Sequence, residues 1–166
     1  MMNPKLVTAL FQALTIFYLF MLGFACGVIL SLGALSAPVI FRDAPIISQG
    51  AIDAFQAGQI MTEIFVRASY VLLFVAILIA IYEILSATIH SQKRFLIFGA
   101  IAIAAILLFV LYYLPAIVEI QKQGEEFLAN SNFHTLHQQS VWVFYIAFYA
   151  LIALFASRLL LLLRHE

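Results

Sequence analysis

Residues 60–88 read IMTEIFVRASYVLLFVAILIAIYEILSAT, and this stretch decides the fold. Its apolar run is longer than the roughly 20 residues that an α-helix needs to cross about 30 Å of hydrocarbon. Backbone amides and carbonyls find no water in the bilayer core, so the segment must satisfy its own hydrogen bonds as a helix. We therefore predict a transmembrane helix here.

Three further apolar stretches have the same character. They cover about residues 6–35, 95–118 and 141–163, and each is long enough to span a membrane. The stretch at 6–35 exceeds one crossing, which predicts tilt or an extension beyond the bilayer. It is also far longer than the apolar region of a signal peptide, so we expect it to be retained. The predicted fold is all-α: an integral membrane four-helix bundle in which residues 1–166 form a single domain.

The composition agrees with a chain embedded in lipid. Hydrophobic residues make up 66% of the sequence and charged residues 10%, whereas soluble domains have about 45–50% and about 25%. A core of this size cannot bury so much apolar surface, so the lipid bilayer must cover much of it. Eight basic residues balance eight acidic ones, which argues against a nucleic-acid partner. The single cysteine, Cys26, excludes an intrachain disulfide and is expected to be a packing residue.

Basic residues predict the orientation, because they collect on the cytoplasmic side of membrane proteins. The side with both termini and the loop near residues 89–94 carries five of them, Lys5, Lys93, Arg94, Arg158 and Arg164. The opposite side has loops near residues 36–59 and 119–139 and carries Arg42, Arg67 and Lys122. We expect a multi-pass protein of the bacterial inner membrane with both termini in the cytoplasm. An aromatic belt at the outer interface is predicted from Tyr112, Tyr113, Trp142, Tyr145 and Tyr149.

Small residues and a proline predict how the helices pack. Gly23, Gly27 and Ser31 recur every four residues on the first helix, and small residues let two helices approach closely in lipid. We favour an internal seam over a homodimer face for this stripe. Pro115 is expected to kink or end the third helix, because proline lacks an amide donor and clashes with the preceding turn.

Charged residues within the apolar stretches need partners or access to water. For Glu83 and Arg158 the two interpretations are an ion pair between helices and independent snorkelling. The second helix carries a polar stripe near its outer end, Gln59, Glu63, Arg67 and Tyr70. Glu63 and Arg67 are spaced for an intrahelical ion pair, which is a structural role. In the functional alternative, the stripe faces the bundle interior and binds a ligand together with Arg42.

Two histidines lie one turn apart near the predicted start of the last helix. His134 and His137 follow residues 130–132, which are good helix-capping types, and Ser140 follows one turn later. Imidazole suits zinc or copper, although a metal site needs more ligands than two. A metal or haem site at these histidines therefore stands beside the alternative of ordinary hydrogen-bonding residues. The cofactor stays unknown, and the absence of a nucleophile elbow or P-loop motif leaves an enzyme without sequence support.

Several segments together resemble the DUF4149 family, which includes a eukaryotic TMEM-type protein linked to cisplatin resistance. They are residues 33–42 (GALSAPVIFR), 57–60 (AGQI) with Ile64, Phe65 and Tyr70, and 133–140 (FHTLHQQS). The resemblance implies a four-helix membrane protein and carries over, as site residues, Pro38, Phe41, Gly58, His137 and Ser140. Residues 141–143 (VWV) depart from the small polar residue usual in that family. Copper-resistance D-type proteins and four-helix protoporphyrinogen oxidases are more distantly similar.

Three hypotheses for the function follow. The favoured one is a non-enzymatic membrane protein that binds, or helps to move, a small solute or metal ion at its outer face, using Arg42, Glu63, Arg67, Tyr70 and Ser140 for the ligand and His134 and His137 for a metal. The second is a redox enzyme that holds haem or a porphyrin between its helices. The third is a structural subunit of a homo-oligomer or membrane complex that uses the small-residue stripe as its contact face.

Overall fold

The computed structural model describes residues 4–90, 95–126 and 131–163. Within these residues, four helices are long and apolar enough to cross a membrane: Ala9–Ile47, Ala54–Ile89, Leu96–Lys122 and Phe133–Leu163. The prediction of an all-α membrane fold with four spanning helices is therefore confirmed.

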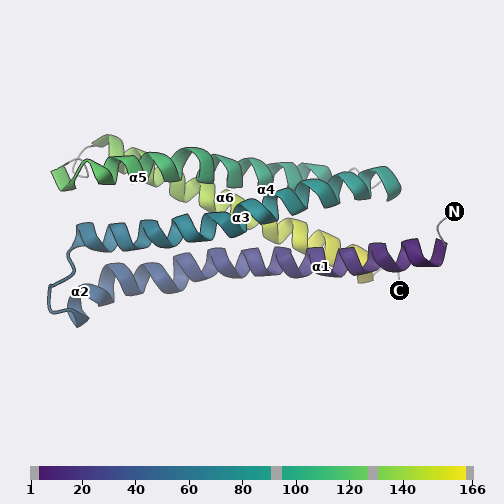
Figure 1. Ribbon diagram of the computed structural model, residues 1–166, viewed down its shortest axis with the longest axis horizontal. Helices are drawn as coiled ribbons and strands as arrows, with labels where there is room; N and C mark the ends of the chain where they lie inside the picture. Colours follow the sequence, from purple (N-terminus) through teal and green to yellow (C-terminus); the bar gives the residue numbers. More distant parts are fainter. Residues whose placement is uncertain (1–3, 91–94, 127–130, 164–166) are drawn as a thin grey trace.

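The spans are built from several helical segments (Figure 1). The first span joins α1 (Pro4–Leu30), the π-helical segments η1 (Ser31–Ser36) and η2 (Val39–Asp43), and the short α2 (Ala44–Ile47). The second span is α3 (Ala54–His90). The third joins α4 (Leu96–Leu108), the π-helical η4 (Phe109–Tyr113) and α5 (Leu114–Lys122), and the fourth is α6 (Ser131–Leu163).

The spans form an elongated bundle with two distinct ends (Figure 1). The start of α1 and the end of α6 lie together at what we call the terminal end, and α2 and α5 lie at the opposite loop end. Neighbours change along the bundle: α3 contacts η2 and α2 near the loop end and packs on α4 further along, while α6 contacts both α5 and α1. An even number of spans thus returns the chain to the end where it began.

Two connections are shorter than predicted. The chain stays helical to Ile47 and resumes at Ala54, so residues 48–53 make the first turn, in which Gln49 and Gly50 have positive φ angles of 53° and 84°. At the third connection the helix continues to Lys122 and resumes at Ser131. Polar residues lowered the hydropathy of these segments, but a helix outside the hydrocarbon tolerates them.

Prolines are accommodated by wider helical turns rather than by helix ends. In η1, the amide of Ala37 bonds the carbonyl of Leu32, five residues earlier, immediately before Pro38. In η4, the amide of Leu114 bonds the carbonyl of Phe109 in the same way, immediately before Pro115. Such π-type turns commonly occur as single insertions within α-helices. The helix does not end at Pro115, as one sequence-based alternative had it, but changes its winding there.

Small residues bring α4 close to α3. A Cβ atom added to Gly99 would lie 3.1 Å from Cγ of Glu83 and 3.3 Å from Cγ2 of Ile79, so this contact is tight. On α1, a Cβ added to Gly23 would contact the ring of Phe155 at 3.6 Å. For Gly27 and Ser31 the prediction of an internal helix contact is wrong. Gly27 has open space around it, and both residues are exposed.

The predicted ion pair between Glu83 and Arg158 is confirmed. It joins α3 to α6, and the two side chains are only 3% and 2% exposed. Tyr18 of α1 donates to Oε1 of Glu83 at 2.9 Å, and Nη1 of Arg158 donates to Ser86 at 3.0 Å. The Arg158 guanidinium also lies 4.2 Å from the ring centroid of Phe95. Three spans are therefore fastened together by one polar cluster inside the bundle.

The helices are longer than a bilayer requires, and this excess length bears on where the loop end lies relative to the membrane. A first span of 39 residues is roughly 58 Å long at about 1.5 Å per residue, against about 30 Å of hydrocarbon. Exposed charged side chains gather toward the loop end, at Arg42, Glu63, Arg67, Glu119 and Lys122. We infer that this end extends through the headgroup layer toward water.

Candidate functional site

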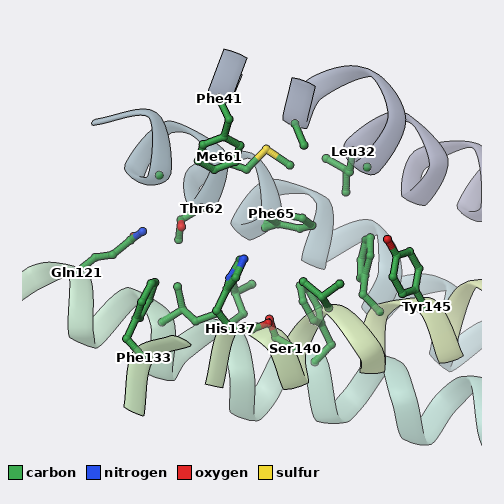
Figure 2. Close-up of a pocket in the computed structure, with 18 of the residues that line it drawn as sticks. Leu32, Phe41, Met61, Thr62, Phe65, Gln121, Phe133, His137, Ser140 and Tyr145 are labelled. Carbon is green, nitrogen blue, oxygen red and sulfur yellow. The ribbon is translucent and has the colours of Figure 1, made fainter. Parts of the chain in front are cut away.

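A cavity of about 360 Å³ lies between the spans near the loop end (Figure 2). All four spans contribute to its wall. Most of the lining is apolar, including three rings that contact one another: Phe65 and Phe144 have centroids 5.3 Å apart, and Phe109 lies 4.9 Å from Phe144. A cavity of this kind is the usual form of a small-molecule site, since such sites are concave and mostly apolar.

The π-helical segments help to build this cavity. Leu32 and Gly33 come from η1, Phe41 from η2 and Phe109 from η4, and all four line it. A π-type turn inserts one residue relative to α-helical winding and rotates everything beyond it by about 100°. The same side chains would therefore face elsewhere on uninterrupted α-helices. The site lies where two spans depart from α-helical geometry.

Polar groups are few in the lining, and most lie on one side. Figure 2 shows Gln121 of α5 and His137 of α6 reaching into the cavity on the side where Thr62 of α3 lies, with Leu32 and the hydroxyl-bearing Tyr145 on the other side. No Asp, Glu, Lys or Arg is among the described residues that line the cavity. Ser140 also lines it, but its hydroxyl donates to the carbonyl of His137 at 2.6 Å.

Gln121 is largely buried but its amide has no partner. The residue is only 9% exposed, and its side-chain amide makes no hydrogen bond to another residue in the described part of the chain. Since no fully buried side-chain polar atom there lacks a partner, the amide is accessible from the cavity. The amide lies beside Gly58 of α3, since a Cβ added there would make an ordinary contact with Nε2 of Gln121 at 3.6 Å. The amide is therefore positioned to bond a guest in the cavity.

The cavity is open to the surface of the bundle. Gly33 and Phe41 of the first span and Val141 and Tyr145 of α6 line the cavity and are also exposed. Ala54 of α3 and His137 of α6 are exposed lining residues as well. The cavity is therefore accessible from outside the bundle near these residues.

The structure brings together some of the residues predicted for the site. His137 and Ser140 line the cavity, as do Phe41 and Gly58, which the family resemblance implied. Pro38 lies between η1 and η2, the two segments that turn Leu32 and Phe41 inward.

The predicted metal ligands are not joined by a third. His134 is exposed and does not line the cavity, although both histidine rings lie near Phe133, with centroids 6.2 Å and 6.0 Å from it. Among the residues that the structure describes, no group of three His, Cys, Asp or Glu side chains is close enough to hold a metal ion. A metal at His134 and His137 stays a prediction that requires ligands from elsewhere.

The polar stripe on α3 faces away from the bundle. Arg67 and Glu63 form the predicted ion pair at 2.9 Å, with side chains 78% and 58% exposed, and Tyr70 is exposed as well. The expectation that this stripe faces the interior is wrong. The inward face of α3 carries Ala57, Met61, Ala68 and Leu72 instead, which lie on the opposite side of a 3.6-residue helix.

Two other predicted polar or aromatic features also lie outside the cavity. Arg42 is exposed and pairs with the neighbouring Asp43 at 2.7 Å. Of the predicted aromatic belt, four side chains face outward, Tyr112, Trp142, Tyr145 and Tyr149. Tyr113 is buried instead, and its hydroxyl donates to Gln139 at 3.4 Å.

Gln121 and Thr62 were not recognised in the sequence. Residues 119–139 were interpreted as a loop, so no helix face was assigned to Gln121. Thr62 lies one residue from Glu63 and was overlooked in favour of the charged stripe. A usable signal was the spacing of Gly58, Met61 and Phe65 along one face of α3.

Comparison with known proteins places this architecture in a family. Neither the curated proteins nor the solved structures that were searched gave a match. The family model described as "Domain of unknown function (DUF4149)" matches residues 20–126, which include η1, η2, η4 and Gln121 of the cavity. The chain, a multi-pass membrane protein with four candidate spans, belongs to the DUF4149 family.

Proposed function

We propose that this protein binds a small, predominantly apolar solute that enters its cavity from the bilayer. The observation that carries the proposal is the mostly apolar cavity of about 360 Å³, with exposed lining residues on the first and fourth spans that we take as its entrance. Ligand pockets of drug-sized molecules have volumes of roughly 300–1,000 Å³, apolar walls and a few placed polar groups. The proposal keeps the solute-binding part of the sequence-based hypothesis and moves its centre from the charged stripe to the cavity.

The proposed orientation places the loop end, and with it the cavity, on the outer side of a bacterial inner membrane. Both termini are then cytoplasmic. Support comes from the five basic residues expected on the side of the termini against three on the other side, since basic residues favour the cytoplasm. The cavity would then receive solutes from the outer leaflet. The whole chain would act as a single domain, because the cavity draws on all four spans.

A binding experiment with a blocked cavity tests the proposal. The protein is placed in lipid nanodiscs, and saturable binding of radiolabelled dodecane and dodecanol is measured above that of empty nanodiscs. Gly33→Phe adds a ring at the cavity opening, where no atom lies within 4 Å of an added Cβ. We expect wild-type protein to bind at least one probe and Gly33→Phe to lose most of that binding.

Gly27→Phe is the matched control. Gly27 lies on the same span, is exposed and has equally open surroundings, but does not line the cavity. Its variant should bind the probes as the wild type does. The proposal fails if wild-type protein shows no saturable binding of either probe, or if the two variants bind equally well.

A further inference from the structure

One polar side chain in the cavity has no hydrogen-bond partner among the residues that the structure describes. Gln121 is largely buried and its amide is directed into the cavity (Figure 2), and since no fully buried polar side-chain atom in the described residues lacks a partner, this amide remains accessible from the cavity. A guest that displaces water from the amide must replace its hydrogen bonds, because an amide removed from water without one is destabilising. A guest that offers both a donor and an acceptor would satisfy it, because the amide itself carries both.

The charge of the guest follows from the rest of the lining. Acidic, Lys and Arg side chains are missing from the lining residues that the structure describes. An ionised group in an apolar cavity without a counter-charge is strongly disfavoured. The guest's polar group should therefore be neutral.

The shape of the guest follows from how the lining is divided. The polar side holds Gln121 and His137, which lie toward the helix ends at the loop end. The apolar side holds the contacting rings of Phe65, Phe109 and Phe144, of which Phe109 and Phe144 lie further along their helices toward the membrane middle. A molecule with a polar head and an apolar tail matches this division, with its tail directed toward the bilayer interior.

We infer that the solute of the proposed function is a neutral single-chain amphiphile whose head is a hydroxyl group, held by Gln121 and His137. A hydroxyl both donates and accepts, as do an amide and a neutral imidazole. This inference rests on the proposed function and specifies its ligand class. Gln121 is the specificity-determining residue, because among the described polar side chains of the lining it is the one that is both largely buried and without a protein partner.

A series of probes with one chain length and different heads tests the inference. Dodecanol, dodecane, dodecanoate and protonated dodecylamine are compared for saturable binding to the wild-type protein in nanodiscs. We expect dodecanol to bind at least severalfold more tightly than the other three. If dodecanoate or dodecylamine binds best, the neutral-head inference is overturned.

The variant Gln121→Leu tests the assigned residue, because leucine has similar size without polar atoms. It should weaken dodecanol binding by about tenfold, the effect of losing roughly one hydrogen bond, and leave dodecane binding equal or tighter. Retained dodecane binding also reports that the variant is folded. Gln123→Leu, at an exposed position on the same helix end, should change neither.

Each outcome separates the two proposals. Saturable binding without preference for dodecanol, or equal loss of both probes in Gln121→Leu, overturns the head-group assignment but leaves the solute-binding function standing. If the wild-type protein shows no saturable binding of any probe, the proposed function itself is overturned. An equal effect of Gln121→Leu and Gln123→Leu on dodecanol would also reject Gln121 as the specificity determinant.

Discussion

At the residue scale, two glutamate–arginine ion pairs contribute differently to stability because one is buried and the other is exposed. Glu83 and Arg158 meet inside the bundle, where Tyr18 and Ser86 add hydrogen bonds to the pair. The ring of Tyr82 stacks on that of Tyr18 at a centroid distance of 3.9 Å and also faces the Arg158 guanidinium. The Glu63–Arg67 pair, in contrast, is exposed. A buried charge that loses its partner is much more destabilising than an exposed one, because lipid and protein cannot solvate it.

This contrast predicts different effects of two matched substitutions. Arg158→Met leaves the Glu83 carboxylate without its cation, so we expect a loss of about 3–5 kcal/mol in the free energy of unfolding. Arg67→Met should lose less than about 1 kcal/mol. Reversible unfolding with sodium dodecyl sulfate in mixed micelles measures both values.

The double variant Glu83→Leu with Arg158→Met is the internal check. It removes both charges, so it should be more stable than Arg158→Met alone. If Arg158→Met is no less stable than Arg67→Met, the ion pair does not fasten the spans as we describe.

At the element scale, the winding of two spans shapes the cavity. Pro115 has no amide to bond the carbonyl of Leu111, and the preceding η4 bonds five residues back instead. This wider turn places Phe109 in the cavity wall. With Pro115 in place, regular α-helical winding would still lack an amide for the carbonyl of Leu111, and it would rotate the side chains on one side of the turn. The proline therefore permits the wider turn that lines the cavity.

Restoring the missing amide should close or reshape the cavity. We expect Pro115→Ala to bind dodecane at least severalfold more weakly in nanodiscs while its thermal stability stays equal or rises, since alanine favours a regular helix. Pro4→Ala is the control, because α1 begins at Pro4, where a proline replaces no helical hydrogen bond. Unchanged binding in Pro115→Ala, or equal loss in both variants, would contradict the role of η4.

At the scale of the whole molecule, the two ends of the bundle differ in construction. The half toward the terminal end is fastened across three spans by the cluster around Arg158. The half toward the loop end holds the cavity, whose lining includes exposed residues. In the proposed function, the fastened half serves as a fixed frame for a site that exchanges its solute with the lipid.

The position of the two ends relative to the membrane is testable by chemical labelling. In a Cys26→Ala background, Ala51→Cys and Gln123→Cys place thiols in exposed connections at the loop end. We expect a membrane-impermeant maleimide to label both in intact cells, whereas epitope tags at the two termini become accessible only after permeabilisation. Labelling of one loop cysteine but not the other would contradict the four-span arrangement, and the inverse pattern at all sites would reverse the proposed orientation.

The amino-acid sequence by itself determined the four spans, because a bilayer demands enough apolar length of every segment that crosses it. It also named Glu83 and Arg158 as a possible ion pair, but snorkelling was an equal alternative and the structure decided between them. Only the tertiary structure decided that Gln121 faces a cavity and that Arg67 faces outward. The reason is that lipid tails and neighbouring helices are both apolar, so hydropathy carries little information about which face of a membrane helix packs inward. On the first and third spans, the rotation introduced at η1, η2 and η4 then assigns the faces, and it arises from backbone hydrogen bonds just before Pro38, Pro45 and Pro115 rather than from any pattern of side chains.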